Sequence, residues 1–152
     1  MADREATEYA KYGATPPTLG DHRKVNGDVH VLIDKVVAAA SDAVDDKLYA
    51  FKLRSNAIIL PSSTVYHEAA GTSVTVNIGD DNDPDGIASL VDVASAGSFS
   101  VLEAVAVDDY GKELWELLGY SEDPKALIDV YYTIKGASTG AETSFVHEIY
   151  FV

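Results

Sequence analysis

The sequence predicts an all-β fold, an antiparallel β-sandwich of the jelly-roll-like kind, with an extended N-terminal arm and at most one short helix. Two observations predict it. Apolar and polar residues alternate in several short segments from residue 28 onward, and loops rich in turn residues separate these segments. Two sheets built from such strands each bury one face against the other, which makes a sandwich the natural architecture.

The first half of the chain supplies five of these segments. Residues 28–37 predict a half-buried strand, with Val29, Val31 and Ile33 on one face and His30, Leu32 and Asp34 on the other. Further alternating segments lie at residues 47–53, 56–60, 63–69 and 72–79. Because Pro61 cannot donate to a strand ladder, we expect 56–60 and 63–69 to be two strands, or one strand with a bulge.

The second half is less regular until its end. Residues 86–99 fit a short helix or a loop that leads into a strand at 98–107. Residues 112–120 carry Leu114, Leu117 and Leu118 at helical spacing, with Asp108 and Asp109 as candidate caps and Gly119 as a stop, and they predict the short helix. Residues 126–136 and 142–152 predict two long strands joined as a hairpin.

Charge divides the chain into two parts. The 25 acidic and 11 basic residues give a formal net charge of -14, and residues 1–26 hold four of each sign, so the whole net charge falls on residues 27–152. Such an acidic body repels phosphate backbones, and we expect no nucleic-acid partner. The apolar runs are too short to span a membrane, and no secretion signal is evident at the N-terminus, so we expect a soluble protein with no membrane partner.

The neutral segment, residues 1–26, predicts an extended arm ahead of the sandwich domain, residues 27–152. It contains several glycines and prolines but too few large aliphatic residues for a core of its own. A frayed terminus is one interpretation. The other is an arm that becomes ordered on a partner, with these contact residues: Tyr9, Tyr12, Pro16, Pro17 and Leu19.

No pattern in the sequence predicts an enzyme. It contains no phosphate-binding glycine loop and no H-E-x-x-H, and the absence of cysteine excludes thiolate chemistry. Its match to G-x-S-x-G, residues 136–140, lies in the turn between two predicted strands and not at the strand-to-helix turn of a nucleophilic serine. Four histidines are scattered along the chain, and their spacing favours ordinary polar-face positions over a metal site: His22, His30, His67 and His147. We therefore expect no catalytic residues and no cofactor.

The acidic stretch DDNDPDG, residues 80–86, is the one motif with the spacing of a calcium loop. Its ligand positions would be filled by Asp81, Asp83, Asp85, Ile87 and Asp92, with Gly86 at the turn. Pro84 stiffens the loop, Asp92 replaces the usual bidentate Glu, and a strand precedes the loop where a helix is usual. These departures favour a solvated acidic turn over a calcium site.

The order of these segments resembles a family. The N-I-G strand end, the D-P-D-G loop, the ASLVDVASAG stretch and the closing strands across residues 28–152 are similar to the small β-sandwich virion proteins of tailed bacteriophages, the head decoration, cement or minor structural proteins. The resemblance implies a non-enzymatic capsid decoration or cement protein on the virion surface, assembled in the host cytoplasm. Its partners would be the major capsid protein and copies of itself, as a homotrimer or another homo-oligomer.

Two alternatives stay open. Within the same family a tail or neck protein would have a similar sequence. From another class, a calcium-assisted carbohydrate-binding sandwich would use exposed Tyr and Trp as a sugar platform. The segment 112–120 and the strong acidity depart from the family pattern and leave the exact role in the particle open.

Overall fold

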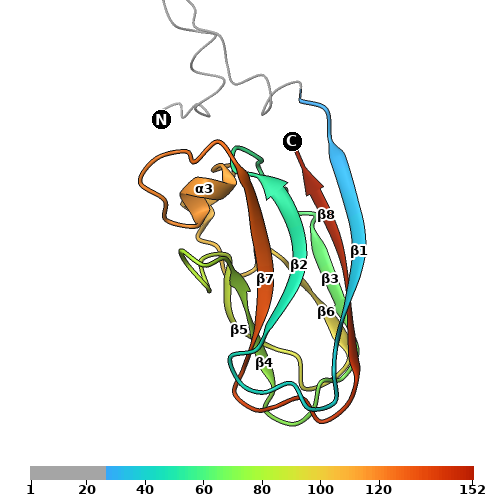
Figure 1. Ribbon diagram of the computed structural model, residues 1–152. Helices are drawn as coiled ribbons and strands as arrows, with labels where there is room; N and C mark the ends of the chain where they lie inside the picture. The colour runs from blue at the N-terminus through green and yellow to red at the C-terminus, as the bar shows by residue number, and fades with distance from the viewer. Residues whose placement is uncertain (1–26) are drawn as a thin grey trace, which may run out of the picture.

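The computed structural model describes residues 27–152, which form two four-stranded sheets laid face to face (Figure 1). The strands are β1 (His30–Ala38), β2 (Lys47–Arg54), β3 (Thr64–His67), β4 (Thr75–Gly79), β5 (Ala88–Asp92), β6 (Gly97–Ser100), β7 (Leu127–Lys135) and β8 (Thr143–Phe151). Sheet A has the order β1-β8-β3-β6, and sheet B has the order β2-β7-β4-β5. The predicted all-β sandwich is confirmed.

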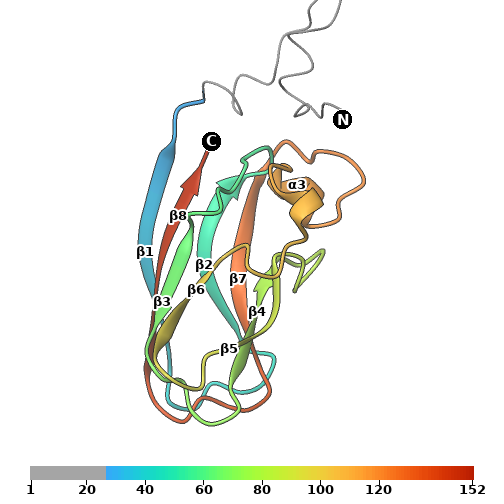
Figure 2. The same ribbon diagram turned by 180° about the vertical axis from the view of Figure 1, so that it is seen from behind.

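The strand pairing is that of a jelly roll. β1 pairs with β8, β2 with β7, β3 with β6 and β4 with β5, and each pair is antiparallel. The first half of the chain therefore pairs with the second half in reverse order, as if one long hairpin had been rolled into two sheets. Figure 2 shows the same two layers from behind. On one side of the sandwich the edge strands of the two sheets are β1 and β2.

The predicted C-terminal hairpin is wrong. β7 pairs with β2 and β4 in sheet B, whereas β8 pairs with β1 and β3 in sheet A. The connection between them crosses from one sheet to the other, a gap of roughly 10 Å that residues 136–142 can span. Gly136, at φ +72°, begins this connection, and a Cβ there would lie 2.2 Å from the carbonyl oxygen of Ser73.

Three other strand predictions need correction. Residues 56–60 form no strand and make one isolated bridge, between Ile59 and Phe151. The strand predicted at 98–107 ends at Ser100, because turns follow it. Residues 88–92, predicted as helix or loop, form β5. Leu90 has φ +52° there, and the register with β4 shifts between Val76 and Ile78, so the simple alternation that marks a strand is lost.

The short helix is confirmed as α3 (Leu114–Leu117), and a 3-10 turn, η1 (Val107–Asp109), precedes it. Asp108 and Asp109 lie in η1 and do not cap α3. The cap is Glu113, whose side chain and that of Glu116 form a reciprocal capping box. Leu114 and Leu118 are fully buried, and the Leu114 amide donates to the Ala57 carbonyl at 2.8 Å, so α3 is fastened over one end of sheet B.

The core lies between the sheets. Sheet A contributes Val65, Phe145 and Ile149, which are at most 1% exposed. Sheet B contributes the following buried residues: Leu48, Ala50, Phe51, Leu53, Val76, Ile78, Ile128, Val130, Tyr132 and Ile134. A bulge between Tyr49 and Phe51 shifts the alternation of β2, which is why both Ala50 and Phe51 point inward. No helix of the described residues is long and apolar enough to cross a membrane.

Candidate functional site

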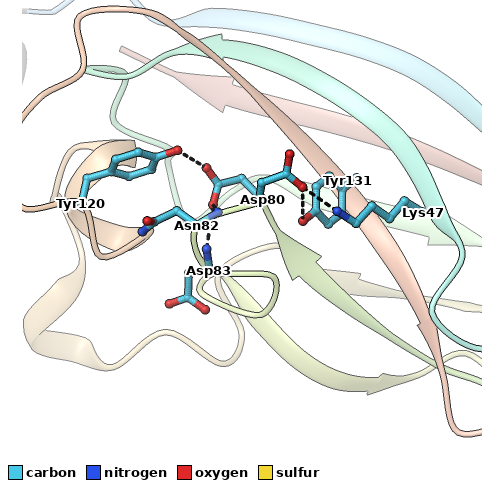
Figure 3. Close-up of polar contacts among 7 residues, drawn as sticks. Lys47, Asp80, Asn82, Asp83, Tyr120 and Tyr131 are labelled. Atoms are coloured by element: carbon cyan, nitrogen blue, oxygen red, sulfur yellow. Dashed lines mark hydrogen bonds and ion pairs between the residues drawn. The ribbon is translucent and has the colours of Figure 1, made fainter.

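The acidic loop that follows β4 is organised by Asp80, a residue outside the predicted ligand set (Figure 3). Asp80 is 3% exposed. Its Oδ1 accepts the amides of Asn82 and Asp83 at 3.0 and 2.9 Å, and its Oδ2 accepts the Tyr120 hydroxyl at 2.5 Å. This hydrogen bond and burial raise the pKa of Tyr120 to about 12, so the hydroxyl stays a donor. The sequence signal for this role is the D-x-N-D pattern of residues 80–83, because an aspartate at the first position of an Asx turn accepts the amides two and three residues later.

The loop is also tied down at its two ends. The Asn82 side-chain amide donates to the Leu118 carbonyl at 2.7 Å, just after α3. At the other end, a Cβ on Gly79 would lie 2.0 Å from the Asp83 carbonyl oxygen, so only glycine allows the loop to fold back this closely. The loop, which connects β4 to β5, is therefore packed against the segment that follows α3.

The predicted calcium ligands do not converge. The Asp81 carboxylate binds the Lys47 ammonium and accepts from the Tyr131 hydroxyl, and these bonds lower the pKa of Asp81. Asp85 accepts from the Ser89 hydroxyl and Asp92 from the Ala94 amide. The remaining two predicted ligands are Asp83, which lies against Gly86, and Ile87, whose amide bonds to Ile78. Within residues 27–152 no group of three His, Cys, Asp or Glu residues is placed to hold a metal ion.

The histidines in the described part of the chain have separate environments. His30 is exposed at the start of β1 beside Phe151. His67 packs between Phe99 and Phe145, and its Nδ1 lies 3.0 Å from the Glu68 carbonyl oxygen. His67 and His147, both predicted to be ordinary polar-face residues, are instead buried, at 9% and 0% exposed. His22 and all the predicted arm contacts, Tyr9, Tyr12, Pro16, Pro17 and Leu19, lie outside the described residues.

The outer face of sheet A is an apolar surface that sequence reasoning missed. Val31, Ile33 and Val37 of β1 are 54%, 63% and 42% exposed, and Val29 just before the strand is 59% exposed. The paired strands continue this face with Val146, Tyr150 and Tyr66. The inner face of β1 carries His30 and Asp34 as well as Leu32, Val36 and Ala38. The alternation favours burial of the face with Val29, Val31 and Ile33, but the structure places that face outside.

This surface also carries few charges. Among the outward positions of the four strands of sheet A, Lys35 and Glu148 are the charged residues. The exposed Glu68, just after β3, adds a second carboxylate near Lys35. The whole protein carries -14. We define the "outer face of sheet A" by Val31, Ile33, Val37, Val146, Tyr150 and Tyr66. An exposed apolar sheet face of this kind is typical of a contact with another macromolecule.

Comparisons with known proteins point to one fold. No protein-family model and no curated protein matches the sequence. Among solved structures, the chain is similar to one from the cyanophage Pam1 capsid asymmetric unit, with a TM-score of 0.58 and 17% sequence identity. The likeness covers 82% of this chain and 84% of that chain. At this identity it establishes a shared fold across most of both chains.

Proposed function

We propose that this protein is a non-enzymatic structural protein of a phage virion, a decoration or cement protein that binds the outer surface of the head. The observation that carries the proposal is the shared fold, since a chain from a phage capsid has this architecture over 84% of its length. The resemblance of residues 28–152 to small phage virion proteins supports it independently. The major capsid protein is the proposed main partner.

The outer face of sheet A is the proposed contact with the capsid. It is apolar and carries few charges, so its burial stabilises a complex without removing many charges from water. The rest of residues 27–152 carries the net charge of -14, and this charge facing solvent would keep particles apart. Residues 1–26 would lie across a neighbouring subunit. Many such contacts on one shell add through avidity.

The test is binding of added protein to heads. Heads would be purified from a phage deleted for this gene and mixed with wild-type protein or with the Val31→Glu, Ile33→Glu double variant, followed by sedimentation. We expect the variant to bind at least about tenfold more weakly, because each glutamate would be buried without a partner. The matched control is Leu90→Glu, a residue equally exposed at 61% on β5 of the other sheet.

Two further measurements complete the test. Protein that lacks residues 1–26 should keep its fold but lose binding to heads. A particle map should place the protein on the head, for example at local threefold positions. Full binding by the double variant would exclude the outer face of sheet A as the contact, and a location at the neck alone would favour a tail or neck protein.

A further inference from the structure

Two adjoining hollows lie at the end of the sandwich where β1 begins and β2 and β8 end, the upper end in Figure 1. Their volumes are about 400 and about 390 Å³, and Arg54 and Leu127 line both. We call the pair the end groove and define it by Lys52, Arg54, Lys125, Leu127, Phe151 and Val152. Its floor is apolar, and Leu127 is 60% exposed there.

The end groove has a small excess of positive charge on an otherwise acidic protein. Residues 27–152 contain seven basic residues, and three of them, Lys52, Arg54 and Lys125, line the groove. Lys52 is paired with Asp129 at 2.9 Å. Arg54 and Lys125 make no ion pair in the described part of the chain, whereas Lys47, Lys112 and Lys135 each have one. Asp123 also lines the groove, but its Oδ1 already accepts from Ser55 and from the Lys125 amide.

The chain outside the described residues offers a complementary segment. It ends at residue 26, four residues before His30, and His30 lines the groove. Residues 2–12 contain two tyrosines, Tyr9 and Tyr12, and three acidic side chains, Asp3, Glu5 and Glu8, against two basic ones, Arg4 and Lys11, so the segment is slightly acidic. Carboxylates suit Arg54 and Lys125, and a tyrosine suits an apolar floor with an arginine at its rim.

We propose that residues 2–12 of one copy bind in the end groove of a neighbouring copy, with acidic side chains beside Arg54 and Lys125 and a tyrosine on Leu127. The 14 residues 13–26 span up to about 50 Å when extended, enough to reach a neighbour. Pro16 and Pro17 favour an extended course over a reversal toward the same copy's groove. This exchange of arms between copies rests on the function proposed above. It assigns the arm a binding site and links neighbouring copies.

Disulfide trapping in the full-length chain tests the exchange without heads, so its result is separate from that of the head-binding test. The natural sequence has no cysteine, so a Tyr9→Cys, Leu127→Cys variant has two defined thiols. Under mild oxidation we expect links between chains, seen as dimers and larger species in denaturing gels. The control is Tyr9→Cys, Leu90→Cys, since Leu90 is as exposed as Leu127 but lies on the edge strand β5, which does not line the end groove.

Charge reversal then tests the chemistry of the contact. Adding Arg54→Glu to the Tyr9→Cys, Leu127→Cys variant should slow the formation of disulfide links by about tenfold. Adding Glu5→Arg and Glu8→Arg to that variant as well should restore much of the rate. Equal linking at Leu90 and Leu127, linking within one chain, or a rate that ignores Arg54→Glu would each overturn the exchange.

Discussion

At the scale of single residues, His147 is the side chain whose chemistry the fold constrains most. It is fully buried between Phe51 and Tyr132, whose ring centroids lie 5.5 and 6.2 Å away. Neither ring nitrogen has a hydrogen-bond partner within the described residues. Burial lowers the pKa of His147, and the charge of Asp34 and the nearby Ala50 backbone, which lies outside hydrogen-bond geometry, oppose this only in part. The core therefore holds a neutral imidazole.

This burial makes stability depend on pH. In the unfolded chain a histidine has a pKa of about 6.5. The folded pKa is lower, so below pH 6.5 the unfolded state binds more protons than the folded state. The contribution of His147 is thus complete above pH 6.5 and is lost as pH falls toward the folded pKa, by up to about 1.4 kcal/mol per pH unit.

Urea unfolding between pH 7.5 and 5.5 measures this loss. We expect the wild type to lose stability over the range and His147→Phe to lose less, because phenylalanine does not titrate and can pack against the same rings. His30→Gln, at an exposed histidine, should leave the pH dependence of the wild type unchanged. Equal slopes for the wild type and His147→Phe would show that the buried imidazole does not titrate as inferred.

The sequence indicates the strand that holds His147 but not its burial. Alternation places Phe145, His147 and Ile149 on one face of β8, and this much is readable. The rings that cover His147 come from β2 and β7, which are remote in the sequence. A histidine on an alternating strand is therefore interpreted as polar-face until the partner strands are known.

At the scale of elements, the loop between β4 and β5 depends on one buried carboxylate. Asp80→Ala would leave the amides of Asn82 and Asp83 and the Tyr120 hydroxyl without their acceptor. We expect the free energy of unfolding to fall by about 2–4 kcal/mol, and by about 1 kcal/mol for Tyr120→Phe, which removes one of the three bonds.

Chemical denaturation of these variants beside Asp85→Ala checks the assignment. Asp85 lies in the same loop, is exposed and makes one side-chain bond, to Ser89, so its loss should change stability by less than about 0.5 kcal/mol. If Asp85→Ala and Asp80→Ala were equally destabilising, Asp80 would not be the organising residue of the loop.

Elements were predictable from sequence where the pattern is local. The helix at 114–117 follows from leucine spacing and the glycine stop, and the β4 strand follows from its alternation. The hairpin between β7 and β8 failed because the pairing of strands is not local, and a short connection can join two sheets as readily as two neighbours. The sequence did not single out Asp80, because the calcium-loop spacing begins at Asp81 and includes only the acidic residues that follow.

At the scale of the whole molecule, the negative charge and the two proposed contact surfaces lie on different parts of the protein. The net charge of -14 lies on the sandwich, while the outer face of sheet A carries few charges and the end groove is slightly basic. The overall charge was readable from composition. The two surfaces were not, because each gathers residues from strands that only the fold brings together, such as β1 with β3 and β2 with β8.

The same charge governs the response to divalent cations. A calcium site built from Asp81, Asp83, Asp85 and Asp92 would raise stability by about 2.7 kcal/mol at a calcium concentration a hundredfold above the dissociation constant, or several degrees in melting temperature. Three of these carboxylates have separate protein partners, so we expect no such site. Any cation should instead screen the repulsion of the acidic body, with the same small effect for calcium and magnesium.

Melting curves in calcium, in magnesium at equal ionic strength and in chelator test this expectation. The calcium and magnesium curves should coincide, and Asp83→Ala should respond to both ions as the wild type does. A rise of several degrees specific to calcium, and lost in Asp83→Ala, would mean that the loop rearranges around the ion and breaks the bond between Asp81 and Lys47. It would also favour the calcium-assisted carbohydrate-binding sandwich over a purely structural role, because the loop would then hold a metal near the exposed Tyr49 of sheet B.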